Sequence, residues 1–261
     1  MAARSTNGGA RWLWLLASGL GLCSSVVVAM QVTATQAMVT QATPATTSAT
    51  TSATTSAITF AMRAPQAIRA VVLLVVLTDP RPGAAGFPPA LINSIEAELQ
   101  RVYQVEVRRI DAHALPRSAF YAPRRRYRAD ALLEFLGEQI PAGAPSRTRV
   151  LGLTTADIST SKDGFKDWGI FGLGELDGTA AVVSSHRLRR KAKDAAQVTW
   201  RVTNTAVHEL GHVLGLEHCE EKDCVMLDAQ GGISNTDAST GEPGPMCRVK
   251  LDRASPLRPP V

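Results

Sequence analysis

Three histidines near the C-terminal third of the chain have spacings that suit the coordination of one metal ion. His208 and His212 are four residues apart, so on a helix both rings project from the same face. This arrangement places two imidazole nitrogens on one Zn²⁺ at about 2.0–2.1 Å each. Glu209 follows the first histidine and can reach a water on that ion without binding the ion itself. The segment therefore predicts a zinc site with a carboxylate that can act as a general base.

The pattern extends beyond these residues and reads His-Glu-x-x-His-x-x-Gly-x-x-His from His208 to His218. Gly215 can adopt a positive φ, which lets the chain leave a helix abruptly and bring His218 back toward the metal. Three protein ligands and one open position are typical of a catalytic zinc, whereas structural zinc sites have four protein ligands. The longer pattern therefore indicates a catalytic zinc centre.

The residues around this motif predict the long helix that carries it. Asp194, with Gln197 three residues later, is typical of a helix N-terminus capped by an acid. Gly215 is typical of the position just after a helix. The apolar positions between these two ends recur at helical spacing and are expected to face the core, and they are Val202, Ala206, Leu210 and Val213.

The segments upstream alternate between strand and helix patterns, which is the order of an open α/β sheet. Ala70–Thr78 is a continuous aliphatic run, so we expect a strand that is buried on both faces at the centre of the sheet. The other expected elements are a helix over Pro88–Tyr103, a strand over Val105–Ile110, a helix over Ala129–Ile140 and a strand over Arg149–Thr154.

A glycine-rich hairpin is expected just before the metal-binding helix. Trp168–Leu173 and Thr179–Ser184 are extended in character, and Leu176–Gly178 supplies the turn between them. Because glycine leaves the backbone accessible, we expect the first of these strands at an exposed edge of the sheet. The residues assigned to an edge that pairs with an extended peptide are Gly169, Ile170, Phe171 and Gly172.

The N-terminal part of the chain has a different composition from the rest. Arg4 and Arg11 precede an uncharged run, Trp12–Met30, which predicts an export signal over residues 1–30 or, alternatively, a membrane anchor. Residues 31–59 are mostly Thr, Ser and Ala, which predicts a flexible linker. The folded domain is then expected over residues 60–261. We therefore expect an exported protein, with a membrane tether through the N-terminal segment as the alternative.

Composition and charge exclude several classes of protein. The chain has 261 residues, of which 45% are hydrophobic and 20% are charged, so it is not disordered as a whole. The net charge is +5, but Arg4 and Arg11 are the only charged residues of 1–62, which leaves 26 basic against 23 acidic groups in the remainder. That balance is ordinary for a globular domain, so nucleic acid is not expected as a partner.

The residues that follow the third histidine resemble those of the archaemetzincins, a branch of the metzincin zinc peptidases. In that family the zinc signature leads directly into Cys-x4-Cys-x-Met, which is here Cys219, Cys224 and Met226. The resemblance implies that the three histidines hold the catalytic zinc and that Glu209 is the general base. It also implies that Met226 forms a hydrophobic floor beneath the metal, a role compatible with that of a core methionine.

The cysteines depart from the pattern of the family that the chain resembles. That family holds a second zinc with four thiolates, and Cys219, Cys224 and Cys247 match three of them. Lys250 stands at the fourth position, and lysine cannot serve as a thiolate. Three alternatives remain open: a three-thiolate zinc site completed by water or a carboxylate, a disulfide favoured by export, or no site.

The residue patterns and the resemblance together predict a mixed α/β domain of metzincin-like fold. A twisted sheet of four or five strands, with an antiparallel edge strand, is expected to pack on the active-site helix. The implied function is zinc-dependent hydrolysis of a peptide or protein substrate by a monomer, with Glu209 activating a water on the zinc. The alternative is a non-catalytic secreted or tethered module that zinc merely stabilises, and Glu209 argues against it because structural zinc needs no base.

Overall fold

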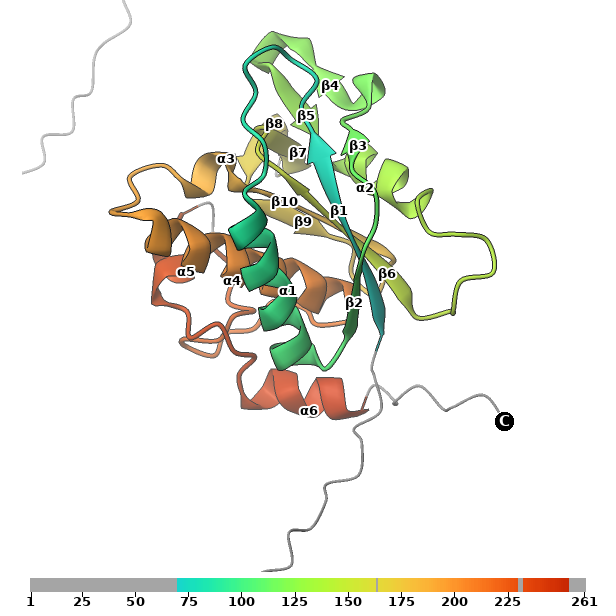
Figure 1. Ribbon diagram of the computed structural model, residues 1–261. Coiled ribbons are helices and arrows are strands. Elements are labelled where there is room, and N and C mark those ends of the chain that lie inside the picture. Colours follow the sequence, from blue (N-terminus) through green and yellow to red (C-terminus); the bar gives the residue numbers. More distant parts are fainter. Residues whose placement is uncertain (1–69, 163, 230–231, 254–261) are drawn as a thin grey trace, which may run out of the picture. The chain divides into compact units, whose positions relative to one another are not determined.

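The main sheet of the fold is mostly parallel and ends in one antiparallel strand (Figure 1). The computed structural model describes residues 70–162, 164–229 and 232–253, so the segments predicted over 1–30 and 31–59 lie outside the described residues. The strand order is β2-β1-β6-β10-β9, and β3 also pairs with β1. The strands are β1 (Val71–Thr78), β2 (Glu106–Arg109), β3 (His113–Ala114), β6 (Thr148–Thr154), β9 (Gly172–Gly174) and β10 (Ala180–Ser184).

Helices cover both faces of this sheet, as the continuous apolar run in β1 predicts. Leu74 lies in a core formed with α1 (Pro89–Tyr103) and α4 (Ala195–Val213) on one face. Leu73 points to the other face and lies in a second core formed with α2 (Ala129–Gly137). Because successive side chains of a strand point to opposite faces, a strand covered on both sides must be apolar throughout. The mixed α/β fold is therefore confirmed, and β1 is an internal strand with partners on both sides, second in the strand order.

A second sheet was not predicted from the sequence. It has the order β4-β5-β7-β8. Its strands are β4 (Phe120–Tyr121), β5 (Arg126–Arg128), β7 (Ile158–Lys162) and β8 (Phe165–Ile170). These strands are short and carry many charged residues, so no apolar alternation marks them. Ion pairs support them instead: Arg126 lies 2.8 Å from Asp157 and 3.0 Å from Asp167.

The predicted hairpin is wrong in its first half. Gly172 belongs to β9 and pairs with Val183 of β10, as expected for an antiparallel edge strand. Gly169 and Ile170 belong to β8, where they pair with β7 of the second sheet. Phe171 lies between the two strands, and its carbonyl accepts a hydrogen bond of 2.8 Å from the backbone of Ser184. Local sequence indicates extended conformation but not which partner a strand takes, and here one extended run is divided between two sheets.

The helix α4 begins and ends where the sequence predicts. The side chain of Asp194 accepts a hydrogen bond of 2.8 Å from the backbone of Gln197 and caps the N-terminus. The predicted stripe is fully buried, with all four of its side chains at 0% exposure. Gly215 follows the helix with φ at +89°, a conformation that glycine adopts without the steric penalty of a side chain.

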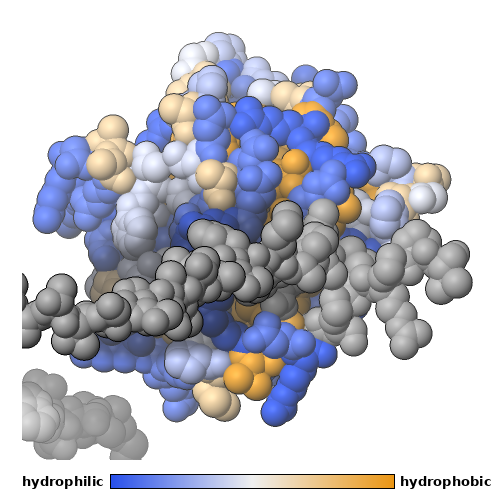
Figure 2. All heavy atoms as spheres, turned by 60° about the horizontal axis from the view of Figure 1, so that its bottom comes forward, coloured by the Kyte–Doolittle hydropathy of each residue, from blue (hydrophilic) through white to orange (hydrophobic). Residues whose placement is uncertain are grey.

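The remaining elements are short. They are the 3-10 turns η1 (Arg117–Ala119) and η2 (Ala122–Arg124) and the helices α3 (Ser185–Leu188), α5 (Ser234–Ala238) and α6 (Pro245–Arg253). Cys247 and Leu251 anchor α6 in the same core as α4. Hydrophilic residues predominate on the described surface that is visible in Figure 2, with smaller hydrophobic areas among them. Among the described residues, no helix combines the length and apolar character that crossing a bilayer requires.

Candidate active site

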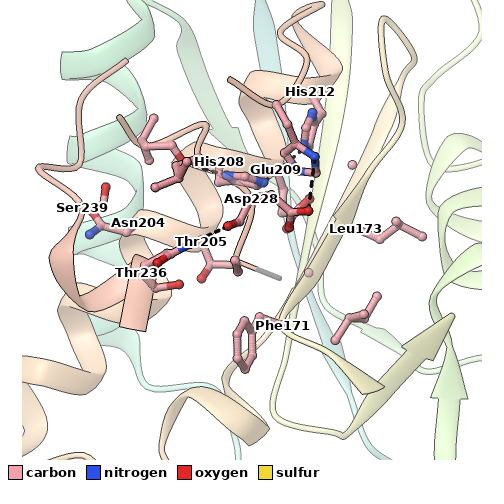
Figure 3. A pocket seen from close by; sticks show the side chains of 18 of the residues that line it. Phe171, Leu173, Asn204, Thr205, His208, Glu209, His212, Asp228, Thr236 and Ser239 are labelled. Atoms are coloured by element: carbon pink, nitrogen blue, oxygen red, sulfur yellow. Dashed lines mark hydrogen bonds and ion pairs between the residues drawn. The ribbon is translucent and has the colours of Figure 1, made fainter. Parts of the chain in front are cut away.

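A cavity of about 480 Å³ lies between α4 and the consecutive strands β8 and β9. Figure 3 shows His208, Glu209 and His212 on α4 at this cavity, with Phe171 and Leu173 across from them. His218, which lies in the loop after α4, lines the same cavity. The structure therefore brings the predicted motif together in one pocket.

The three imidazole rings converge as metal ligands do. The Nε2 atoms of His208 and His212 are 3.1 Å apart. Two nitrogens at about 2.0–2.1 Å from one tetrahedral zinc would be about 3.3 Å apart, which is close to this distance. The ring centre of His218 lies 5.3 Å from that of His208 and 4.7 Å from that of His212. One nitrogen from each ring lies within 4.8 Å of the others, so the donor set fits a zinc ion.

Backbone carbonyls orient two of these rings. The Nδ1 atom of His208 lies 2.7 Å from the carbonyl oxygen of Val225, and that of His212 lies 2.7 Å from the carbonyl oxygen of Leu216. A carbonyl can only accept, so each Nδ1 carries the proton and each Nε2 presents its lone pair. Burial, with a contribution from His212, lowers the pKa of His208 to about 4. Both effects favour the neutral imidazole that binds a metal.

The side chain of Glu209 projects from α4 toward β9, the edge strand of the main sheet. Its side chain is buried, with 7% exposed. Burial raises the pKa of Glu209 to about 8, and a hydrogen bond from the backbone of Gly174 opposes that rise. A carboxyl group whose pKa lies near neutrality is suited to take up and release a proton.

Two glycines of β9 make room for this carboxyl group. A Cβ atom on Gly172 would lie 2.6 Å from both Cγ and Oε1 of Glu209. A Cβ atom on Gly174 would lie 2.3 Å from the carbonyl oxygen of Glu209. Any larger residue at these positions would therefore push the strand away from α4. The close approach explains why the edge strand is rich in glycine.

Met226 packs against α4 at the turn that carries the two histidines. Its side chain is fully buried, and a Cβ atom on Gly211 would come within 2.5 Å of its Sδ atom. Gly211 directly precedes His212, so the methionine packs against the helix between the two histidines. This position is compatible with the hydrophobic floor that the resemblance implies.

The predicted substrate edge lines the cavity even though two sheets share it. β9 is the end strand of the main sheet and β8 is the end strand of the second sheet. Residues 168–174, which span the junction of the two strands, all line the cavity. The four assigned residues therefore lie along one continuous edge beside the histidines.

The three cysteines of the described residues lie together near this site, and all are free thiols. The Sγ atoms of Cys224 and Cys247 are 3.9 Å apart, which is too far for a disulfide. Cys219 and the carboxylate of Glu221 complete the group, with one atom from each residue within 4.8 Å of the others. A carboxylate was among the ligands that the sequence left open, and the position of Glu221 between two of the cysteines was a usable signal for it. The backbone groups that orient the histidines and Glu209 leave no such signal.

Comparison with known proteins agrees with this geometry. Residues 93–253 match peptidase family M54. The chain belongs to this family. An archaemetzincin from Haloquadratum walsbyi is 31% identical over 147 residues, which cover 53% of this chain and 79% of the relative.

Solved structures of the family share the fold. The crystal structure of archaemetzincin from Methanopyrus kandleri aligns with a TM-score of 0.58 and 28% identity, over 74% of this chain and 98% of that one. A zinc-dependent peptidase from Methanocorpusculum labreanum aligns with a TM-score of 0.54 and 25% identity, over 69% of this chain and 100% of that one. The chain is therefore a zinc metallopeptidase of the archaemetzincin family, and zinc is its metal.

Proposed function

We propose that His208, His212 and His218 are the ligands of the catalytic zinc and that Glu209 is the general base for peptide-bond hydrolysis. One observation carries this assignment: the buried carboxyl group of Glu209 lies at the same cavity as the three converging imidazoles. A purely structural zinc site has no use for a carboxyl group held in this way. The non-catalytic binding module is therefore not favoured.

The residues of the site divide the chemistry between them. When zinc is bound, it supplies Lewis acidity that polarises the scissile carbonyl group and lowers the pKa of a water. The carboxylate of Glu209 takes a proton from the attacking water and returns it to the nitrogen of the leaving amine. The hydrogen bond from the backbone of Gly174 holds this carboxyl group in place through both transfers.

The edge formed by β8 and β9 is the proposed binding surface for the substrate. An extended peptide that adds to a free sheet edge gains main-chain hydrogen bonds and presents its carbonyl groups to the neighbouring site. Gly169, Ile170, Phe171 and Gly172 supply that edge, and all four line the cavity beside the histidines. We therefore propose an extended peptide or unfolded protein segment as the substrate.

Replacing Glu209→Gln tests the assignment because it removes the proton acceptor and retains the shape of the side chain. With a mixed fluorogenic peptide library as substrate, we expect kcat to fall by about 10²–10⁴-fold while the zinc content stays unchanged. His212→Ala should remove the catalytic zinc and the activity together. Glu220→Gln, at an exposed neighbour outside the cavity, is the control and should leave both unchanged. Retention of activity in Glu209→Gln would refute the role of this residue.

We also propose that the N-terminal segment directs export and that the active protein is a monomer. The basic start and the uncharged run Trp12–Met30 support export, with a membrane tether as the alternative. Mass spectrometry of the N-terminus in the external, membrane and soluble internal fractions tests this proposal. A shortened chain outside the cell supports a cleaved signal, an intact chain in the membrane supports a tether, and an intact chain in the soluble internal fraction refutes export.

A further inference from the structure

A second cluster of metal-binding groups lies beside the loop that carries His218. It consists of three thiols and one carboxylate rather than four thiols. Its members, which we call the thiolate cluster, are Cys219, Cys224 and Cys247 together with Glu221. We propose that the three thiolates hold a second zinc ion and that the carboxylate of Glu221 is its fourth ligand.

The spacing of the sulfur atoms fits a shared metal ion. Two sulfurs at about 2.3 Å from one tetrahedral zinc would be about 3.8 Å apart. The Sγ atoms of Cys224 and Cys247 are 3.9 Å apart. A disulfide would hold them at about 2.05 Å, so the two thiols are not bonded to each other. The separation therefore matches a pair of metal ligands.

Glu221 is half-buried, and one of its two carboxylate oxygens is shielded from solvent without a hydrogen-bond partner among the described residues. Its Oε1 atom accepts a hydrogen bond of 3.1 Å from the backbone of Met246. Its Oε2 atom is buried and has no hydrogen-bond partner among the described residues. Leaving a buried carboxylate oxygen unpaired is costly, and a metal ion in the thiolate cluster would remove that cost.

A glycine provides the space that this carboxylate occupies. A Cβ atom on Gly244 would lie 2.1 Å from Oε2 of Glu221 and 3.4 Å from Cβ of Cys224. The loop before α6 therefore accommodates the carboxylate only because residue 244 has no side chain. The backbone of Gly244 also donates a hydrogen bond of 3.0 Å to Sγ of Cys224, a contact that suits a metal-bound thiolate.

Lys250 is turned away from the cluster. Its side chain is 50% exposed, and its Nζ atom lies 3.2 Å from Oε2 of Glu217. Helix α6 thus contributes one ligand, Cys247, and the loop between Cys219 and Cys224 contributes the remaining three. With four protein ligands and no open position, the proposed centre is a structural one.

The position of the centre indicates what it stabilises. Cys219 directly follows His218, and its backbone donates a hydrogen bond of 3.1 Å to the carbonyl oxygen of Met226. The backbone of Met226 in turn donates a hydrogen bond of 3.3 Å to Sγ of Cys224. A metal in the cluster would therefore fasten the loop that carries His218 and Met226 to helix α6.

Zinc content and coordination in a His212→Ala background isolate this centre from the catalytic one. We expect one zinc per chain, with X-ray absorption showing three sulfurs at about 2.3 Å and one oxygen at about 2.0–2.2 Å. Adding Glu221→Gln should weaken zinc binding, measured by chelator competition, by more than the roughly 10–100-fold that partners outside the coordination sphere contribute. Gln retains an oxygen for the backbone of Met246, so the loop keeps that hydrogen bond.

Two further variants make the result decisive. Glu220→Gln, which removes one charge from the adjacent exposed residue, should bind zinc as tightly as the background protein. Adding Lys250→Cys to Glu221→Gln should restore tight binding with four sulfurs around the zinc. Unchanged zinc affinity in Glu221→Gln would overturn the assignment of this ligand. Absence of zinc from the background protein would overturn the centre as a whole, whatever the activity of the catalytic site.

Discussion

Gly211 occupies a helical position at which alanine would ordinarily stabilise the protein, and the structure reverses that expectation. Alanine is favoured over glycine inside a helix by about 1 kcal/mol. A Cβ atom on Gly211, however, would lie 2.5 Å from Sδ of Met226 and 2.7 Å from the hydroxyl oxygen of Tyr103. Tyr103 is fully buried, and its hydroxyl group donates a hydrogen bond of 2.8 Å to the carbonyl oxygen of Val207. Gly211→Ala therefore has to displace two buried groups.

The cost of that displacement exceeds the gain in helix propensity. Overpacking a core costs about 1–3 kcal/mol, and breaking a buried hydrogen bond costs about 1–3 kcal/mol more. After subtraction of the propensity gain, we expect Gly211→Ala to lower the free energy of unfolding by about 1–5 kcal/mol. At the middle of that range, Tm would fall by about 6–12 °C for a domain of this size.

Equilibrium urea unfolding of four proteins in saturating zinc tests this reasoning. They are the parent chain, Gly211→Ala, Tyr103→Phe and the double variant. Because Tyr103→Phe removes the oxygen that the new Cβ atom would meet, the two substitutions should be coupled by about 1 kcal/mol or more. Gly137→Ala, in a helix where the nearest atom to an added Cβ lies 3.9 Å away, is the control and should be neutral or stabilising. A Gly211→Ala variant as stable as its parent, or additive with Tyr103→Phe, would refute the argument.

Two further predictions concern the catalytic base and the ion pair between Arg201 of α4 and Asp237 of α5. Gly172→Ala would place a Cβ atom 2.6 Å from Oε1 of Glu209. Because this displaces the carboxyl group, we expect kcat to fall by at least about tenfold while the zinc content is retained. An unchanged kcat would contradict the packing of β9 on α4. The guanidinium group of Arg201 donates hydrogen bonds to Asp237 and lowers the pKa of that carboxyl group. The pair therefore stabilises the fold fully above the unfolded-state pKa of about 3.9. This contribution is lost as pH falls through the native pKa of Asp237. Asp237→Asn should therefore lower the free energy of unfolding near pH 7 by about 1–2 kcal/mol. The difference in stability between the variant and the parent should vanish below the native pKa of Asp237. A difference that persists in acid would show another cause.

The catalytic motif is the part of this protein that local sequence specifies best. The spacing of His208 and His212 follows from helix geometry, and Asp194 and Gly215 mark the ends of that helix by local capping and backbone preferences. The continuous apolar run of β1 likewise required a strand covered on both faces. These predictions succeeded because each rests on a residue pattern within one segment of the chain.

The second sheet and the division of the edge strand could not be predicted in this way. Gly169 and Gly172 lie in the same extended run, yet one pairs with β7 and the other with β10. Strand pairing depends on partners that are distant in sequence, and the short charged strands of the second sheet carry no apolar pattern that would reveal their partners. The same limit applies to the contact of Gly172 with Glu209, which joins two residues more than thirty positions apart in the sequence.

The sequence by itself determined which groups this protein has for binding zinc and moving a proton, because residue type and helical spacing decide that chemistry. Only the tertiary structure decided their environment: the burial that raises the pKa of Glu209, the carbonyl groups that orient His208 and His212, and the edge beside them. It also brought Glu221 among the thiols and turned Lys250 outward. Burial, orientation and contact across the fold are properties of the packed chain, so they emerge only when distant segments meet.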